Sequence, residues 1–138
     1  PILKHKHSFN APLAGILLKV ALKFSVGQPF HLQRDIDLCK SEYCNFQKLR
    51  YYGLVDKAYK NGRRMGGYWV LEPYVEVVLH NDVTLAKWVE TYNNEVVARS
   101  EEKILFKDAY GEYDIPELWA RRARPMRFSE DKQMAWRY

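Results

Sequence analysis

Apolar side chains recur at three- and four-residue steps from Leu13 to Phe24. This spacing predicts an amphipathic helix of about a dozen residues, because residues three and four apart share one face of an α-helix. Asn10 precedes the run as an N-cap, and Pro12 falls in the first turn, where proline is well tolerated. Gly27 is expected to end the segment.

Three further elements are predicted before the chain reaches Gly53: a short extended piece at residues 29–32, a short helix at 34–39 and a third helix at 42–52. Ser41 is the expected N-cap of the third helix. Gly53 is the expected left-handed residue that ends it.

After Gly53 the apolar pattern alternates, which predicts β-strands rather than helices. Residues 54–59 and 68–71 form the strands of one predicted hairpin, with Asn61-Gly62 and Gly66-Gly67 as turn residues between them. A short helix is expected at residues 73–79.

A second hairpin is predicted around Asn93-Asn94, with strands at residues 84–92 and 95–98. Asparagine tolerates the positive φ angles of a tight type I′ turn. Residues 103–106 are expected to add a strand and residues 117–122 a short helix, followed by a basic, arginine-rich tail. The apolar second hairpin either packs on the first part of the chain or forms a dimer interface.

Helix, short strand, helix, helix and hairpin is the order of a winged helix-turn-helix. Phe46, Leu49 and the exit Gly53-Leu54-Val55 resemble the recognition-helix-into-wing segment of winged-helix DNA-binding proteins, and the resemblance covers about residues 10–79. Within it, the family's wing tip corresponds to Arg63, Arg64, Gly66 and Gly67.

The predicted fold class is α+β: the resemblance implies a winged helix-turn-helix with three helices plus a β-hairpin wing, and the pattern of the later residues predicts its extension by a C-terminal β-hairpin and a short helix. The predicted domains are residues 1–80, the winged-helix domain, and residues 81–138, a hairpin extension and basic tail packed on the first part. The second segment resembles no family that we recognise.

Charge points to a polyanionic partner. The 138 residues carry a formal net charge of +5, and 47% of them are hydrophobic, which suits a folded, basic protein. No apolar run reaches the roughly 18 residues that a membrane span needs, and no secretory signal is recognisable, so a cytoplasmic protein is expected.

The third helix and the wing supply the candidate nucleic-acid contacts. Phe46 and Leu49, with Cys44 or Tyr52, are expected to point inward, which leaves polar, basic and tyrosine side chains outside. Such side chains donate to bases and phosphates. The predicted nucleic-acid-binding residues are Tyr43, Asn45, Gln47, Lys48, Arg50, Tyr51, Lys60, Arg63 and Arg64. The other interpretations are an ordinary solvated helix face and a basic hairpin that resists aggregation.

Metal binding and catalysis find little support. Cys39 and Cys44 have no second Cys or His pair at zinc-site spacing, and they lie where a helix-turn-helix buries small apolar residues. The paired carboxylates have no neighbouring histidine, and there is no P-loop or Rossmann glycine motif. No metal, no cofactor and no enzyme activity are expected.

The sequence therefore predicts a small transcriptional regulator of prokaryotic or phage type that contacts double-stranded DNA, with a homodimer as one arrangement. The alternative is a winged-helix protein-protein interaction module with no nucleic-acid role. RNA recognition is a third interpretation, although no paired stacking platform of the RNA-binding-sheet type is recognisable.

Overall fold

A computed structural model describes residues 4–111, and the predicted helix at 117–122 and the basic tail lie outside this range. The strands are β1 (His5–Ser8), β2 (Phe30–His31), β3 (Val55–Lys60), β4 (Arg63–Leu71), β5 (Leu85–Ala86), β6 (Trp88–Tyr92), β7 (Glu95–Arg99) and β8 (Lys103–Ile104). The helices are α1 (Ala11–Lys23), α2 (Lys40–Phe46), the 3₁₀ helix η1 (Gln47–Tyr52), α3 (Tyr74–Leu79) and α4 (Phe106–Tyr110).

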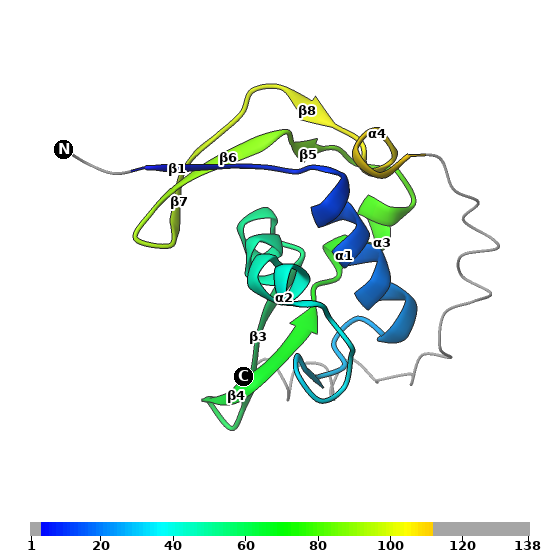
Figure 1. Ribbon diagram of the computed structural model, residues 1–138, viewed down its shortest axis with the longest axis vertical. Coiled ribbons are helices and arrows are strands. Elements are labelled where there is room, and N and C mark those ends of the chain that lie inside the picture. The colour runs from blue at the N-terminus through cyan, green and yellow to red at the C-terminus, as the bar shows by residue number, and fades with distance from the viewer. Residues whose placement is uncertain (1–3, 112–138) are drawn as a thin grey trace.

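The predicted three-helix winged helix is wrong. The described part of the chain is α+β but rich in sheet, with eight strands in three antiparallel sheets and only four short α-helices. The strand orders are β1-β6-β7, β2-β4-β3 and β5-β8. Figure 1 shows the β3–β4 turn near one end of the long axis, with β5, β8 and α4 at the other end and β1 nearer to them.

The predicted second helix at residues 34–39 does not form: residues 32–35 lie in turns that side-chain hydrogen bonds stabilise, and residues 37–39 have no regular structure. The Asp35 carboxylate accepts a hydrogen bond from the backbone N–H of His31 at 2.7 Å. His31 Nδ1 in turn accepts from the backbone N–H groups of Gln33 and Arg34, each at 3.2 Å. Local side-chain bonds of this kind compete with helix formation and hold the segment in turns.

The predicted third helix is divided into α2 and the tighter η1. Gly53 ends η1 with φ +75°, as predicted, and the Leu54 N–H donates to the Leu49 carbonyl at 3.2 Å. This is the backbone pattern of a glycine-terminated helix. Tyr52 is the inward residue, whereas Cys44 is exposed.

Several local predictions are confirmed. Asn10 caps α1 by accepting from the Leu13 N–H at 3.1 Å. The β3–β4 and β6–β7 hairpins form, and Asn93 and Asn94 have φ angles of 51° and 63° in the second turn. The short extended piece and the short helix after β4 appear as β2 and α3.

One buried cluster draws on both halves of the described chain. Phe24 stacks on Phe30 with ring centroids 4.4 Å apart, and Phe46 lies edge-on to Trp69 at 5.2 Å. The same cluster contains residues of the second half of the chain, such as the fully buried Val89 and Phe106. The sheet β1-β6-β7 therefore packs against the segment that contains α2 and η1.

Candidate nucleic-acid interface

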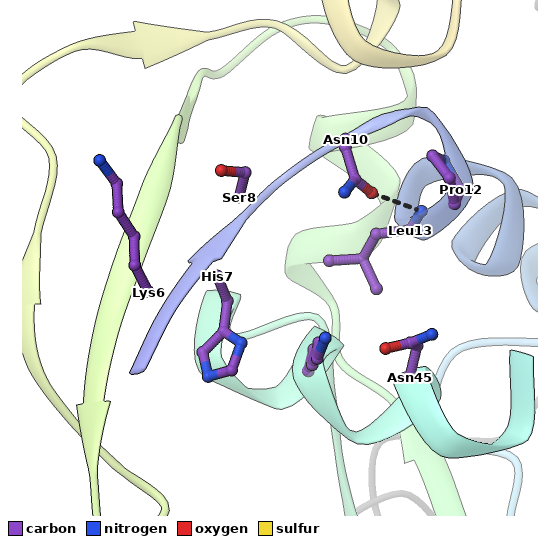
Figure 2. A pocket seen from close by; sticks show the side chains of 8 residues that line it. Lys6, His7, Ser8, Asn10, Pro12, Leu13 and Asn45 are labelled. Carbon is purple, nitrogen blue, oxygen red and sulfur yellow. Dashed lines mark hydrogen bonds between the residues drawn. The ribbon is translucent and has the colours of Figure 1, made fainter. Parts of the chain in front are cut away.

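A cleft of about 430 Å³ separates β1 from α2 and η1, and we call it the β1 cleft. Figure 2 shows it from close by, with β1 on one side, Asn45 on the other and the start of α1 at one end. The residues that line it are Lys6, His7, Ser8, Asn10, Pro12, Leu13, Asn45 and Lys48. No carboxylate occurs among these described lining residues, so the cleft favours an anionic or neutral polar ligand.

The α1 end of the cleft offers few free backbone donors. The Leu13 N–H is already bonded to the Asn10 side chain, the dashed bond in Figure 2. Pro12 has no N–H. A ligand in the β1 cleft is therefore held by side chains, and Lys48 is the cation on the η1 side.

The β1 strand presents different side chains to its two sides. His7 points toward the α2–η1 side, whereas Lys6 and Ser8 point away from it (Figure 2). The Lys6 ammonium lies 4.5 Å from the centre of the Trp88 ring, a cation–π contact. Lys6 therefore lines the rim of the cleft and His7 faces its interior.

His7 connects the cleft to η1. Its ring stacks on Tyr51 with centroids 5.4 Å apart, and its Nε2 lies 3.0 Å from the Thr91 hydroxyl oxygen. Burial lowers the pKa of His7 below its ordinary 6.5, and the positive charges of Lys48 and His5 lower it further. The imidazole is therefore mainly neutral at pH 7.

A second cleft, of about 200 Å³, lies on the other side of η1, and we call it the tyrosine cleft. It is lined by Tyr51, Tyr52, Gly53, Tyr74, Thr84, Leu85, Ala86, Val89, Arg99 and Lys103. These described lining residues again include no carboxylate.

Strand register places the two cations of the tyrosine cleft. Val89 pairs with His7 on one side and with Arg99 on the other, so the three side chains form a row on one face of the sheet. Lys103 pairs with Ala86 in the neighbouring β5–β8 ladder. Both cations therefore stand directly opposite residues that line the cleft.

η1 lies across the His7–Val89–Arg99 row and is bonded to both of its ends. The Tyr52 hydroxyl donates to the His7 carbonyl at 2.8 Å, and Arg99 donates a long 3.5 Å hydrogen bond to the Tyr51 carbonyl. Burial raises the pKa of Tyr52 to about 12, so its hydroxyl stays a donor at neutral pH. These bonds fix η1 between the two clefts.

The structure brings together only some of the nine predicted contact residues. Asn45 and Lys48 line the β1 cleft, and Tyr51 lines the tyrosine cleft. Arg50 is turned toward the β6–β7 turn, where it donates to the Asn94 carbonyl at 3.5 Å. The Asn45 amide donates back to the Ser41 carbonyl at 2.8 Å, so that N–H is occupied within its own helix.

The other predicted residues lie elsewhere. Tyr43 lines a separate depression of about 260 Å³, and Gln47 is exposed. Lys60, Arg63 and Arg64 lie at the β3–β4 turn, which Figure 1 shows well away from β1. The nine residues therefore do not line a single site.

Sequence reasoning missed the half of the site that comes from other segments. His7 precedes the first predicted helix, and Arg99 and Lys103 lie far from the third helix in sequence. His7 and Arg99 come to lie beside η1 only because β1, β6 and β7 pair. A local pattern carries no signal for this arrangement.

The cysteines lie outside both clefts. Cys39 and Cys44 are free and exposed, so the prediction that they are buried is wrong. The Cys39 Sγ lies 3.4 Å from the Ser41 hydroxyl at the start of α2. Residues 4–111 contain no group of three His, Cys, Asp or Glu side chains arranged to hold a metal ion.

Comparisons with protein-family models, with curated proteins and with solved structures give no match for this chain. No helix within residues 4–111 is both long enough and apolar enough to cross a lipid bilayer.

Proposed function

We propose that this protein binds nucleic acid through the phosphate backbone, using the surface around η1. We call Lys48, Tyr51, Arg99 and Lys103 the η1 surface. The observation that carries the proposal is that both clefts beside η1 have cations and no carboxylates among their described lining residues. Lysine and arginine on a concave surface attract a phosphate chain and release its counterions.

The geometry of η1 supports a linear ligand. A 3₁₀ helix has three residues per turn, so Lys48 and Tyr51 lie in one row, about 6 Å apart along the helix axis. The row runs from the β1 cleft to the tyrosine cleft. A chain of phosphates that follows it meets Lys48 first and then the pair of Arg99 and Lys103.

The cations of the η1 surface are not neutralised by the ion pairs found among residues 4–111. Those pairs join Lys19 to Glu42 at 3.2 Å and Lys87 to Glu102 at 2.8 Å. The positive charges of Lys48, Arg99 and Lys103 are therefore available to a polyanion. Contact by the β3–β4 turn and duplex recognition through the third helix remain predictions from the sequence.

The proposal is tested by fluorescence anisotropy with a labelled oligonucleotide, titrated at several salt concentrations. Each phosphate contact adds about 0.7 to the slope of log affinity against log salt for single strands and about 0.9 for duplex. Lys48→Gln should therefore reduce the slope by about that amount. Lys107→Gln removes the same charge from α4, outside both clefts, and should leave the slope unchanged.

Two outcomes count against the proposal. If wild type and Lys48→Gln have equal slopes of log affinity against log salt, Lys48 of η1 does not contact the nucleic acid. Displacement of the oligonucleotide by polyglutamate at the same charge concentration would favour an acidic protein partner instead.

A further inference from the structure

We propose that the tyrosine cleft receives one unpaired base of a single-stranded nucleic acid while Arg99 and Lys103 hold the adjacent phosphates. This inference rests on the proposed function, since it specifies which nucleic acid the η1 surface takes. The cleft combines aromatic side chains, a buried aliphatic floor and two cations at one place. Aromatic rings beside a basic groove are the usual means of binding single strands.

The floor of the cleft is apolar and fixed. It is formed by Leu85, Ala86 and Val89, all buried in the fold. Val89 is held in the β1-β6-β7 sheet from both sides by its pairing with His7 and Arg99. The apolar side chains beneath the cleft are therefore fixed by the fold before any ligand binds.

Two tyrosines stand at the walls of the cleft in fixed positions. The Tyr74 side chain is 37% exposed, and its hydroxyl donates to the Thr84 carbonyl at 3.0 Å, which anchors the far end of the ring. Tyr51 is held by its stack on His7, with ring centroids 5.4 Å apart. Because both rings are already ordered, a base that contacts them costs little additional side-chain entropy.

The rim supplies positive charge next to the aromatic walls. Arg99 and Lys103 are exposed side chains opposite Val89 and Ala86, respectively. A nucleotide offers a planar ring and an anionic phosphate, which suit these two kinds of side chain. The described lining has no carboxylate to repel that phosphate.

A base in a duplex cannot use this cleft, because its faces are covered by its stacked neighbours. Entry would require unpairing and flipping, which lowers affinity unless the base is already unpaired. The cleft volume of about 200 Å³ is that of a pocket for one small group and not of a duplex groove. The inference therefore predicts a preference for single strands.

The test compares three ligands of equal length with the full chain at low salt: a thymidine oligonucleotide of about a dozen residues, the abasic sugar–phosphate chain, and a duplex. Stacking of one base, worth about 1–3 kcal/mol, corresponds to about a 5- to 160-fold change in affinity. The base-bearing single strand should bind more tightly than the abasic chain by a factor in this range, and more tightly than the duplex.

The outcomes separate this inference from the proposed function. Equal affinity for the abasic and base-bearing strands, or tighter binding of the duplex, would overturn the base pocket but leave phosphate binding intact. If none of the three ligands binds at low salt, the proposed function itself fails.

Variants locate the pocket. Tyr74→Ala should lower affinity for the thymidine strand toward that of the abasic chain and leave abasic binding unchanged. Tyr92→Ala removes an equally exposed tyrosine outside both clefts and should change neither affinity. If Tyr74→Ala keeps the full preference for the base-bearing strand, the base does not bind in the tyrosine cleft. The comparison of the three ligands uses wild type and does not depend on how any variant folds.

Discussion

The hydroxyl of Tyr52 provides a direct test of how η1 is held between the clefts. It donates to the His7 carbonyl at 2.8 Å, and the Tyr52 side chain is 8% exposed. Tyr52→Phe removes this donor and keeps the edge-on contact of the ring with Phe9, whose centroid lies 5.1 Å away. The substitution therefore isolates a single hydrogen bond.

The expected loss follows from the ordinary worth of such a bond. A part-buried hydrogen bond contributes about 0.5–1.5 kcal/mol net, and the substitution removes one such bond to the His7 carbonyl. We expect the free energy of unfolding to fall by about 1 kcal/mol. For a chain of 138 residues this corresponds to a fall in Tm of about 3–5 °C.

Urea unfolding followed by tryptophan fluorescence measures the change. The urea midpoint should fall while the slope m stays constant, because little extra surface is exposed. Tyr92→Phe, an exposed tyrosine on β6, is the matched control and should leave the midpoint unchanged. An unchanged midpoint in Tyr52→Phe would refute the claim that this bond holds η1 on β1.

Alkaline pH extends the same test. Burial raises the pKa of Tyr52 from its ordinary value of 10.0 to about 12, with Arg99 acting in the opposite direction. A group with a raised pKa in the folded state stabilises the fold fully below its unfolded pKa and loses that contribution as pH rises through the folded one. Wild type should therefore lose its advantage over Tyr52→Phe between pH 10 and about pH 12. A constant difference between the two midpoints would contradict this.

Three further predictions concern other residues. Gly67→Ala should lower the free energy of unfolding by about 1–3 kcal/mol in thermal or urea unfolding. The Gly67 φ angle is +78°, and the new Cβ would lie 2.6 Å from His31 Nε2. Gly66→Ala is the control, because its new Cβ would have no atom within 4 Å. The pKa of His7 is lowered below 6.5 and a bound phosphate favours its charged form, so oligonucleotide affinity should rise as pH falls below that value; His7→Gln should flatten this dependence in anisotropy titrations. Arg64→Ala should change the salt slope less than Lys48→Gln does, and a larger change would favour the β3–β4 turn as the main contact.

Local chemistry made part of the fold predictable. Asn10 before an apolar helical run, Gly53 after one, and Asn93-Asn94 between alternating segments each specify a backbone conformation within a few residues. The structure has the N-cap, the left-handed glycine and the tight turn at these positions. Each of these signals acts over one turn of chain.

The overall fold was not predictable in the same way. The wrong three-helix prediction arose because residues 34–39 have an apolar spacing compatible with a helix, whereas Asp35 and His31 bond the backbone into turns. The pairing of His5 with Thr91 joins two segments that lie far apart in the sequence. No periodicity within either segment encodes such a pairing.

The candidate site divides along the same line. Lys48 and Tyr51 were predicted, because a basic, tyrosine-bearing helical segment is visible in the sequence. His7, Arg99 and Lys103 were not, because they reach η1 only through strand register. The prediction thus included cleft residues that η1 supplies and missed those that the strands supply.

Salt dependence tests the central claim most directly. With Lys48, Arg99 and Lys103 each contacting one phosphate of a single strand, log affinity should fall with log salt at a slope of about −2. Between about 50 and about 200 mM salt, the affinity of wild type should then decrease about 20-fold. Absence of binding at the lower salt concentration, or an affinity that does not change between the two, would contradict nucleic-acid binding by the η1 surface.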